Sequence, residues 1–239
     1  MVYFKNIALI TALATLLSAP SFAKEDPNYH FSVGLGSAKG SFDENYTIGS
    51  TQGSTLSASG NAGSLDFSFG PNYKINDTFS ISPELFFSTA GFEFKTTRSA
   101  ISQNGASTAS TTQTLETSAS YGLRSNFSID INKKSYVNFL LGYSLLEAKS
   151  SANITTSESP NNQKEEKTLT GDSILYGIGW GYRLDDSIHT LVSIERTDYS
   201  IEHDYALNIP SNIDFGGNLI RSKYDIELTD FKFRVIYNF

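Results

Sequence analysis

The chain of 239 residues contains no cysteine, and this absence excludes two ways of holding a fold together. No disulfide bond can form, and no structural metal site can be built on thiolates. Positive charge is also scarce, because 18 Lys and Arg stand against 25 Asp and Glu, which leaves a net charge of −7. An acidic balance of this kind disfavours nucleic acid and anionic membrane surfaces as partners.

Only one long apolar run is present, and it lies at the N-terminus. The segment "MVYFKNIALITALATLLSAPSFA" has one cation, Lys5, then an apolar stretch over 7–17, then small residues up to Ala23. The stretch is short for a spanning helix, which needs about 20 apolar residues. We therefore predict a signal peptide over 1–23, cleaved after Ala23, and one domain over 24–239.

Beyond residue 23 the helical period of apolar residues is missing, and a period of two replaces it. The chain holds 17 Phe and 13 Tyr, and most of them alternate with polar or small residues. The pattern predicts an all-β protein with eight strands. Their clearest stretches are 29–35, 65–73, 79–87, 121–131, 137–145, 174–184, 188–194 and 231–239.

Short and long connections alternate between these strands. Residues 75–78, 132–135 and 185–187 read "INDT", "NKKS" and "DDS", which are typical of tight turns. Long polar segments cover 40–60, 96–114, 149–168 and about 201–222. This order predicts an eight-stranded antiparallel up-and-down transmembrane β-barrel, with three short periplasmic turns and four long extracellular loops.

Glycine decides which face of the sheet points inward. A soluble barrel would put the large apolar residues inside, whereas a membrane barrel turns them toward lipid. The glycines fall opposite the aromatic residues, and an eight-stranded barrel has room inside for small side chains only. The glycine face also carries the charges Asp66, Glu84, Arg124, Arg183, Glu195, Lys232 and Arg234. We therefore expect the aromatic residues to face lipid.

Five of these charges form the candidate site of the barrel interior. We expect Glu84, Arg124, Glu195, Lys232 and Arg234 to make an internal salt-bridge network that fills the lumen. The alternative is a gated pore lined by the same residues. Our hypothesis is that no open channel exists.

Two places break the alternation. Tyr224, Ile226 and Leu228 have the opposite parity to Phe231 and the residues after it. A bulge near Thr229–Asp230 would explain this, and so would a strand segment that projects beyond the bilayer. A similar slip occurs at Ala90–Gly91. The strand boundaries near 90–95 and 222–230 thus stay open, and Phe92 and Phe94 are interpreted as part of an aromatic girdle near the long loops.

Enzymatic chemistry has little support in the sequence. The histidines are His30, His189 and His203, and the pair His203–Asp204 invites a Ser–His–Asp interpretation that a solvated loop histidine explains better. The loop acids Asp43, Glu44, Glu202, Asp204 and Asp214 match no calcium-loop spacing. We expect no enzyme activity and no catalytic, cofactor or metal site.

The whole pattern resembles the small eight-stranded outer-membrane barrels of bacteria: the OmpA-type barrel, OmpX/Ail-like proteins and opacity-type surface antigens. The sharpest match is the C-terminal strand, which alternates aromatic residues and ends on one: Phe231, Phe233, Val235, Tyr237 and Phe239. The resemblance implies that this strand is the signal read by the barrel-assembly machinery. It also implies a bacterial outer-membrane protein in contact with lipid and lipopolysaccharide, and we expect a monomer.

The polar loops are then the candidate functional surface, because binding residues concentrate on loops held by a rigid scaffold. We expect surface adhesion through an extracellular protein or glycan ligand. The alternatives are a structural barrel that maintains the outer membrane and, with less support, a small porin-like channel. The loops lack a basic cluster, which argues against heparin-like ligands.

Overall fold

The computed structural model describes residues 27–48, 51–52, 55–101, 108–156, 159–206 and 219–239, and they are almost entirely β-strand. No helix among them is long and apolar enough to cross a membrane. The predicted signal peptide and its cleavage after Ala23 lie outside the described residues and stay predictions. The strands are β1 (Asn28–Ile48), β2 (Thr51–Gln52), β3 (Leu56–Lys74), β4 (Phe79–Ala90), β5 (Glu93–Ile101), β6 (Thr108–Asp130), β7 (Ser135–Thr156), β8 (Ser159–Arg183), β9 (Ile188–Ala206) and β10 (Leu219–Asn238).

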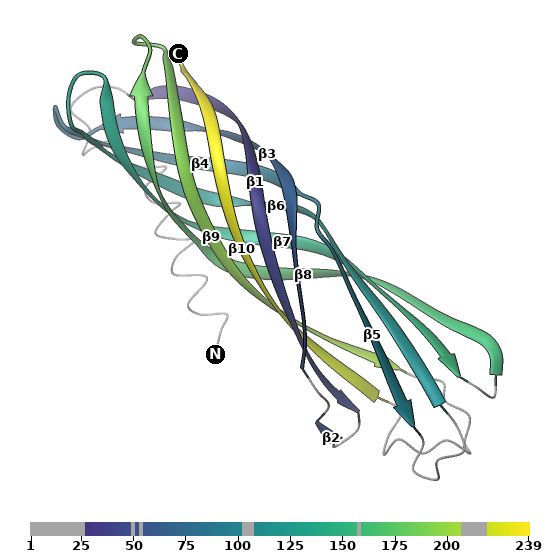
Figure 1. The fold of residues 1–239 in the computed structure, drawn as a ribbon. Coiled ribbons are helices and arrows are strands. Elements are labelled where there is room, and N and C mark those ends of the chain that lie inside the picture. The colour runs from purple at the N-terminus through teal and green to yellow at the C-terminus, as the bar shows by residue number, and fades with distance from the viewer. Residues whose placement is uncertain (1–26, 49–50, 53–54, 102–107, 157–158, 207–218) are drawn as a thin grey trace.

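The strands form one antiparallel sheet that closes on itself (Figure 1). Neighbours along the chain pair in turn, and β10 pairs with β1 to complete the ring. Two of the ten strands do not add a separate position to the ring. β2 pairs with the end of β1, and β5 continues the line of β4 along β6 after a break at Gly91. The antiparallel up-and-down barrel is therefore confirmed, with eight positions around the ring where the sequence predicted eight strands.

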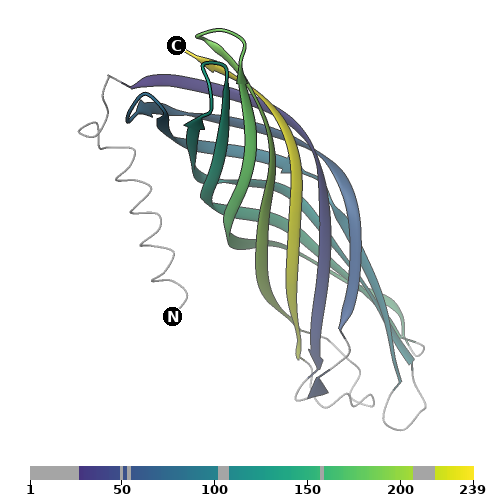
Figure 2. The same cartoon turned by 60° about the vertical axis from the view of Figure 1, so that its left-hand side comes forward.

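The three tight turns are built alike. In each of them an Asn or Asp carbonyl or carboxylate oxygen accepts a hydrogen bond from the backbone N–H two residues ahead. Asn76 accepts from Thr78, Asn132 from Lys134, and Asp185 from Ser187, at 2.8–2.9 Å. This local bond is the reason that Asn and Asp favour turns. The C-terminus lies at the same end (Figure 2). There Tyr29 and Phe239 exchange two backbone hydrogen bonds.

A belt of exposed apolar side chains surrounds the half of the molecule nearest these turns. Leucine, isoleucine, valine and aromatic residues point outward, as predicted, and the glycines and charges of the same strands point inward. Along β8 the belt begins at Ile174 and extends to Leu184, just after the strand, and along β10 it begins at Phe231 and extends to Phe239, just after that strand. A transmembrane strand needs about 9–11 residues, so the belt is as tall as a bilayer core.

The strands are much longer than that belt. β8 has 25 residues and β7 has 22, about twice what a span requires. The prediction of four long loops over 40–60, 96–114, 149–168 and 201–222 was therefore wrong in extent. Most of the described residues in these segments are paired strand. The segments were misread because most of their outward residues are polar or charged, and because their inward positions alternate apolar residues such as Phe42 with polar ones such as Glu44.

In the half of the molecule farther from the tight turns, apolar side chains face inward and polar side chains face outward. This arrangement is the reverse of the one in the belted half. Tyr224 and Ile226 are only 1% and 0% exposed, and they face the interior that Lys232 and Arg234 also face. The ladders of β10 with β1 and β9 continue without a shift past Thr229 and Asp230. The described ladders of β10 therefore contain no bulge, and the bulge explanation is wrong. The explanation by a segment that projects beyond the bilayer stays a prediction. A register shift does occur in β6, between Thr117 and Ala119.

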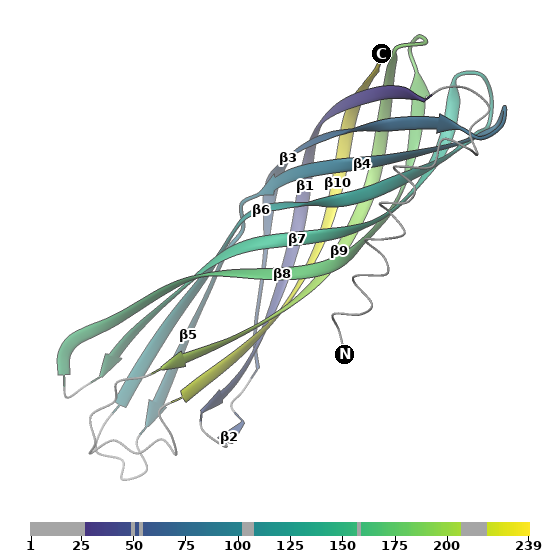
Figure 3. The same ribbon diagram turned by 180° about the vertical axis from the view of Figure 1, so that it is seen from behind.

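The ring splits as it leaves the belt. The β3–β4 ladder ends at Ser64–Ala90 and the β8–β9 ladder ends at Leu175–Thr197. Beyond these pairs the described residues form two antiparallel four-stranded sheets, β9-β10-β1-β3 and β5-β6-β7-β8 (Figures 1 and 3). We call this part the sandwich half and the belted part the barrel half.

An apolar core lies between the two sheets of the sandwich half. One sheet contributes Ala38, Phe42, Tyr199, Ile201, Tyr224, Ile226 and Leu228, and the other contributes Phe92, Phe94, Leu115, Leu146, Ala148 and Leu169. Phe42 stacks between Phe94 and Tyr224, with ring centroids 5.3 and 5.5 Å away. The assignment of Phe92 and Phe94 to an aromatic girdle was therefore wrong, because both rings belong to this core.

Candidate functional site

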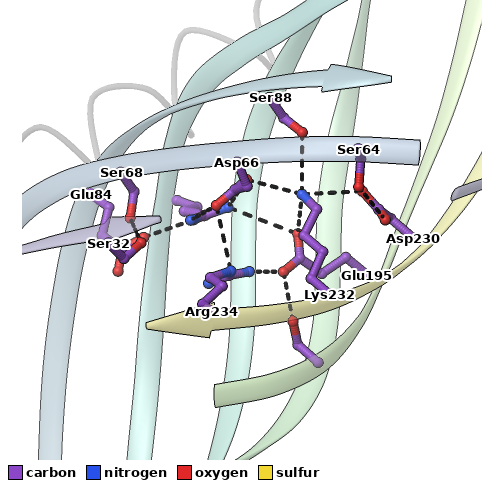
Figure 4. Close-up of polar contacts among 12 residues, drawn as sticks. Ser32, Ser64, Asp66, Ser68, Glu84, Ser88, Glu195, Asp230, Lys232 and Arg234 are labelled. Carbon is purple, nitrogen blue, oxygen red and sulfur yellow. Dashed lines mark hydrogen bonds and ion pairs between the residues drawn. The ribbon is translucent and has the colours of Figure 1, made fainter. Parts of the chain in front are cut away.

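The lumen of the barrel half contains the five charged residues that the sequence singled out. Glu84 comes from β4, Arg124 from β6, Glu195 from β9, and Lys232 and Arg234 from β10. All five are buried and point inward at the height of the apolar belt. Figure 4 shows four of them around Asp66, which comes from β3. The inward positions of five strands thus meet in one cluster, which we call the lumen network.

Asp66 is the centre of the lumen network. Its two carboxylate oxygens accept from Arg124 Nη1 and Nη2 at 3.0 and 2.8 Å, in a bidentate pair. Lys232 Nζ donates to the same carboxylate at 3.0 Å, and Arg234 Nε lies 3.5 Å from it. A bidentate guanidinium–carboxylate pair fixes orientation as well as charge, so Asp66 and Arg124 hold each other in one geometry.

The two glutamates extend the network to either side. Glu84 accepts from Arg124 Nε at 2.7 Å, and its other oxygen contacts His30 Nε2 at 2.9 Å. Glu195 accepts from Lys232 Nζ at 3.1 Å and forms an ion pair with Arg234. Every carboxylate of the network therefore contacts more than one cationic or polar partner, which is what a buried charge requires.

The network brings four carboxylates and three cations together. Asp66, Glu84 and Glu195 face Arg124, Lys232 and Arg234, and Asp230 lies 3.3 Å from Lys232 Nζ at the edge of the cluster. Glycines make room for these long side chains. A Cβ on Gly34 would lie 2.9 Å from Arg234 Cγ, and one on Gly142 would lie 2.7 Å from Arg124 Cβ. A space-filling cluster of closely paired charges is suited to close a narrow lumen.

Sequence reasoning missed three members of the network. Asp66 was placed on the inward face but was not counted in the cluster, His30 was considered only among the histidines weighed for catalysis, and Asp230 only as part of a bulge. All three lie at inward positions of their strands, where they contact Arg124, Glu84 and Lys232, respectively. The strand parity alone would have included them, since every charged inward residue of a narrow lumen needs a partner.

Open space in the lumen lies toward the turns. A polar cavity of about 490 Å³ opens at that end, lined by Asn72, Lys74, Asp130, Arg183 and His189 among others. Arg183 Nη2 donates to Asp130 at 2.6 Å within it. On the far side of the network a cavity of only about 40 Å³ remains, bordered by Phe86, Leu175 and Tyr199. The apolar core of the sandwich half begins directly beyond this small cavity.

The outer surface of the sandwich half is polar and carries both signs of charge. Arg196 Nη2 lies 2.9 Å from Glu227, Arg221 Nε 2.8 Å from Asp204, and Lys149 Nζ 3.4 Å from Glu166. Exposed pairs of this kind contribute about 0–1 kcal/mol each, so their main effect is solubility. They also leave no basic cluster on the described surface.

The His203–Asp204 pair does not form a catalytic arrangement. His203 points inward, where its Nδ1 lies 3.3 Å from Lys167 Nζ, whereas Asp204 points outward and accepts from Arg221 at 2.8 Å. Successive strand residues face opposite sides, so the two cannot act on each other. Within the described part of the chain no group of three or more His, Cys, Asp or Glu side chains could hold a metal ion. Asp214, one of the acids considered for calcium, lies outside the described residues.

The alternating residues of the last strand all lie on the belt. Phe231, Phe233, Val235, Tyr237 and Phe239 are exposed on the outer face. The ring of Phe239 stacks on Tyr237 and on Phe69 at 6.2 and 6.5 Å. The C-terminal residue therefore closes the ring through its backbone and joins an aromatic cluster at the turn end of the belt.

The family model described as "Outer membrane protein beta-barrel domain" matches residues 9–239. No curated protein matches the chain.

Several solved structures are similar. OprG of Pseudomonas aeruginosa is 11% identical with a TM-score of 0.41, over 88% of this chain and 97% of that one. Ail, the attachment invasion locus protein of Yersinia pestis, in complex with the heparin analogue sucrose octasulfate, is 14% identical with a TM-score of 0.30, over 85% and 98%. Neisserial surface protein A is 14% identical with a TM-score of 0.31, over 84% and 96%.

Proposed function

Because the chain belongs to the outer membrane protein beta-barrel domain family, we propose that it is a sealed barrel that presents its sandwich half to molecules outside the cell. The single observation that carries the proposal is the inversion of the strands beyond the belt. Ten or so residues of each long strand continue as a paired sheet with an apolar core and a polar surface. Such a body is stable in water, whereas a lipid-facing surface would be apolar.

The side of the membrane follows from the turns. In outer-membrane barrels the short turns face the periplasm and the longer connections face the outside. Asn76, Asn132 and Asp185 mark the short turns, and the sandwich half lies at the opposite end. The mixed-charge outer surface and the hairpin ends of the sandwich half are then the parts available to an extracellular protein or glycan.

A transport function through the lumen has less support than binding at the surface of the sandwich half. The lumen network and the apolar core lie one behind the other between the turn-end cavity and the outside. We expect no stable single-channel conductance when the monomeric protein is reconstituted in planar bilayers. Reproducible conductance steps from protein that is fully folded, as judged by its heat-modifiable mobility, would contradict the sealed lumen and would favour the porin-like alternative.

A binding experiment tests the proposed function itself. Cells that express the chain are compared with cells that express a trimmed variant, in which residues 207–218 are replaced by a four-residue Gly/Asn linker between β9 and β10. Both strains, together with a strain that lacks the protein, are tested for adhesion to surfaces coated with extracellular proteins or glycans. We expect adhesion above the empty strain and a reduction on trimming.

Equal adhesion of all three strains would contradict the interaction role. If the strain without the protein were also sensitive to detergent, a structural role in the outer membrane would replace the interaction role. We further propose that the last strand, from Phe231 to Phe239, serves as the assembly signal, since its outward aromatic residues and its closing position next to Tyr29 support that role. We also propose that the chain has no catalytic function of its own.

A further inference from the structure

The charges of the lumen network leave one negative charge in excess. Three cations face four carboxylates, and the two carboxylates at the ends of the network contact one of these cations each. Asp230 contacts Lys232 and its side chain is 13% exposed, whereas Glu84 contacts Arg124 and its side chain is 2% exposed. A buried charge that is not balanced costs free energy. The Glu84 end is therefore the place where a further positive charge is needed.

A small cavity lies beside Glu84, on the side of the lumen network that faces the tight turns. Its volume is about 40 Å³, and the residues that border it include Glu84, Ser82, Asn126, Ser128 and Asn138. None of the three cations of the network is among the described residues that border it. Arg183 does border it, but this cation is already paired with Asp130 at 2.6 Å. Hydroxyl, amide and carboxylate oxygens are therefore gathered around this small space.

Two amide oxygens of the residues that border this cavity accept no hydrogen bond from the described residues. They are Asn126 Oδ1 and Asn138 Oδ1, on residues that are 5% and 0% exposed. The amide nitrogens of the same side chains do have partners, because they donate to Glu84 and to Ser128 Oγ. A buried carbonyl oxygen without a partner costs free energy, and buried polar groups in native proteins nearly always have one. Both oxygens therefore indicate a bound partner that carries a positive charge or a donor group.

The small cavity is reached from the turn end of the barrel. It adjoins the open polar cavity of about 490 Å³, because both are bordered by Asn72, Ser80, Arg183, His189 and Asn238. On its other side lie Glu84 and Arg124, whose side chains are almost completely buried. A small solute thus has access to Glu84 from the turn end, while the lumen network and the apolar core close the opposite end.

We propose that this cavity binds one small monovalent cation, such as K⁺, Na⁺ or ammonium, between Glu84, Asn126 and Asn138. Carbonyl oxygens replace the hydration shell of such an ion, and the charge of the ion balances the excess negative charge of the lumen network. The volume of about 40 Å³ has room for a water molecule or for an ion in its place. The site lies in the lumen, so the inference goes beyond the proposed function and does not depend on what the sandwich half binds.

Two other ways of balancing the charge explain less. Ca²⁺ takes about 6–8 oxygen ligands and Mg²⁺ keeps several of its waters, which is too much for this small cavity beside a single carboxylate. A proton on His30 would also supply a positive charge, because His30 Nε2 lies 2.9 Å from Glu84. It would still leave Asn126 Oδ1 and Asn138 Oδ1 without a partner. A bound monovalent cation satisfies the charge and both oxygens together.

Anomalous diffraction locates the cation directly. Crystals of the full-length folded protein are transferred to thallium(I) acetate at neutral pH, because Tl⁺ is similar to K⁺ in size and scatters strongly. We expect an anomalous peak in the small cavity, within coordination distance of Glu84, Asn126 Oδ1 and Asn138 Oδ1. Density for water alone at this position would overturn the proposal.

A stability measurement follows cation binding in the membrane. The urea midpoint of the protein in vesicles of uncharged lipid is compared in potassium chloride and in the chloride of N-methylglucamine, a cation too large for the cavity, at equal ionic strength. A ligand that binds only the folded state stabilises that state by mass action. With a dissociation constant of about 10 mM, K⁺ at about 200 mM lowers the unfolding equilibrium constant about 20-fold. We therefore expect a higher midpoint in potassium chloride, and equal midpoints would overturn the proposal.

Variants assign this effect to the site, and each variant is compared with itself in the two salts, so that its overall stability does not matter. Asn126→Leu with Asn138→Leu should abolish the difference between the salts, and Asn138→Leu alone takes the place of the double variant if that yields no heat-modifiable barrel. Ser144→Ala is the matched control and should keep the full difference, because Ser144 is a buried inward residue of the same β7 on the far side of the lumen network. A difference that persists without the amide oxygens would overturn the proposal. So would a difference that appears only in His30→Gln, because a proton on His30 would then balance Glu84 in the natural protein.

Discussion

Replacement of Phe42 by alanine probes whether the sandwich half is a body with its own core. Phe42 is 2% exposed and its ring lies between the rings of Phe94 and Tyr224, on opposite sheets. A buried Phe→Ala change costs about 3–5 kcal/mol, through lost burial and the cavity left behind. Since about 1.4 kcal/mol is a factor of ten, the opening equilibrium of this half should rise by roughly two to three and a half orders of magnitude.

Hydrogen exchange followed by mass spectrometry in nanodiscs measures this effect strand by strand. For Phe42→Ala we expect faster exchange in peptides that cover 36–44 and 219–230, which belong to the sandwich half. Peptides that cover 231–239, in the belt, should be unaffected, because the bilayer and the lumen network hold the barrel half separately. Ser41→Ala is the matched control, because it changes the neighbouring, outward-facing residue of the same strand and should stay within about 0.5 kcal/mol.

The reasoning would be refuted if exchange over 36–44 and 219–230 did not respond to Phe42→Ala. It would also be refuted if 231–239 responded equally, because the two halves would then be one cooperative unit. A response to Ser41→Ala as large as that to Phe42→Ala would show that the outward face carries the stability.

Further predictions concern the lumen, the sandwich interior and the last strand. Asp66→Asn removes the carboxylate that Arg124, Lys232 and Arg234 share and should destabilise the folded barrel by about 3–5 kcal/mol, seen as a lower urea midpoint in vesicles; an unchanged midpoint argues against the network. Burial, together with the Lys167 ammonium, lowers the pKa of His203 below its usual 6.5. The sandwich half is thus most stable above about pH 6.5 and loses stability as the pH falls, so the NMR titration of His203 should have its midpoint below 6.5; a midpoint above 6.5 reverses this sign. Phe239→Ser should reduce heat-modifiable barrel in cells more than Phe31→Ser on β1 does, and equal yields would remove the assembly role.

The barrel half could be predicted from the sequence because each of its signals is local. Alternation of large apolar residues with glycine fixes which side of a strand faces lipid, and Asn76, Asn132 and Asp185 fix the turns. The inward charges followed from the same parity. Only their detailed partners did not, since the bidentate contact between Asp66 and Arg124 joins residues 58 positions apart in the chain.

The sandwich half could not be predicted from the sequence, and the reason is physical. Its strands expose Ser, Thr and charged residues to water, and polar residues such as Glu44, Gln113 and Ser222 also occupy some of the buried inward positions, so each segment reads as a polar loop. In the segment 40–45, for example, the core receives one large apolar residue, Phe42, and the residues after it are Asp, Glu and Asn. The two ladders that end at Ala90 and Leu175 leave no mark in composition, because a missing backbone partner does not depend on the side chain.

The most direct test of the whole account is a single-cysteine scan along the outer face of β7, with a spin label at each position in a nanodisc. Oxygen and a water-soluble nickel complex report contact with lipid and with water, respectively. The account predicts lipid contact at 137, 139, 141, 143 and 145 and water contact at 147, 149, 151 and 153, with the switch between Leu145 and Glu147. Lipid contact that continues to Asn153, or water contact along the entire strand, would contradict a barrel that crosses the membrane and then becomes a sandwich above it.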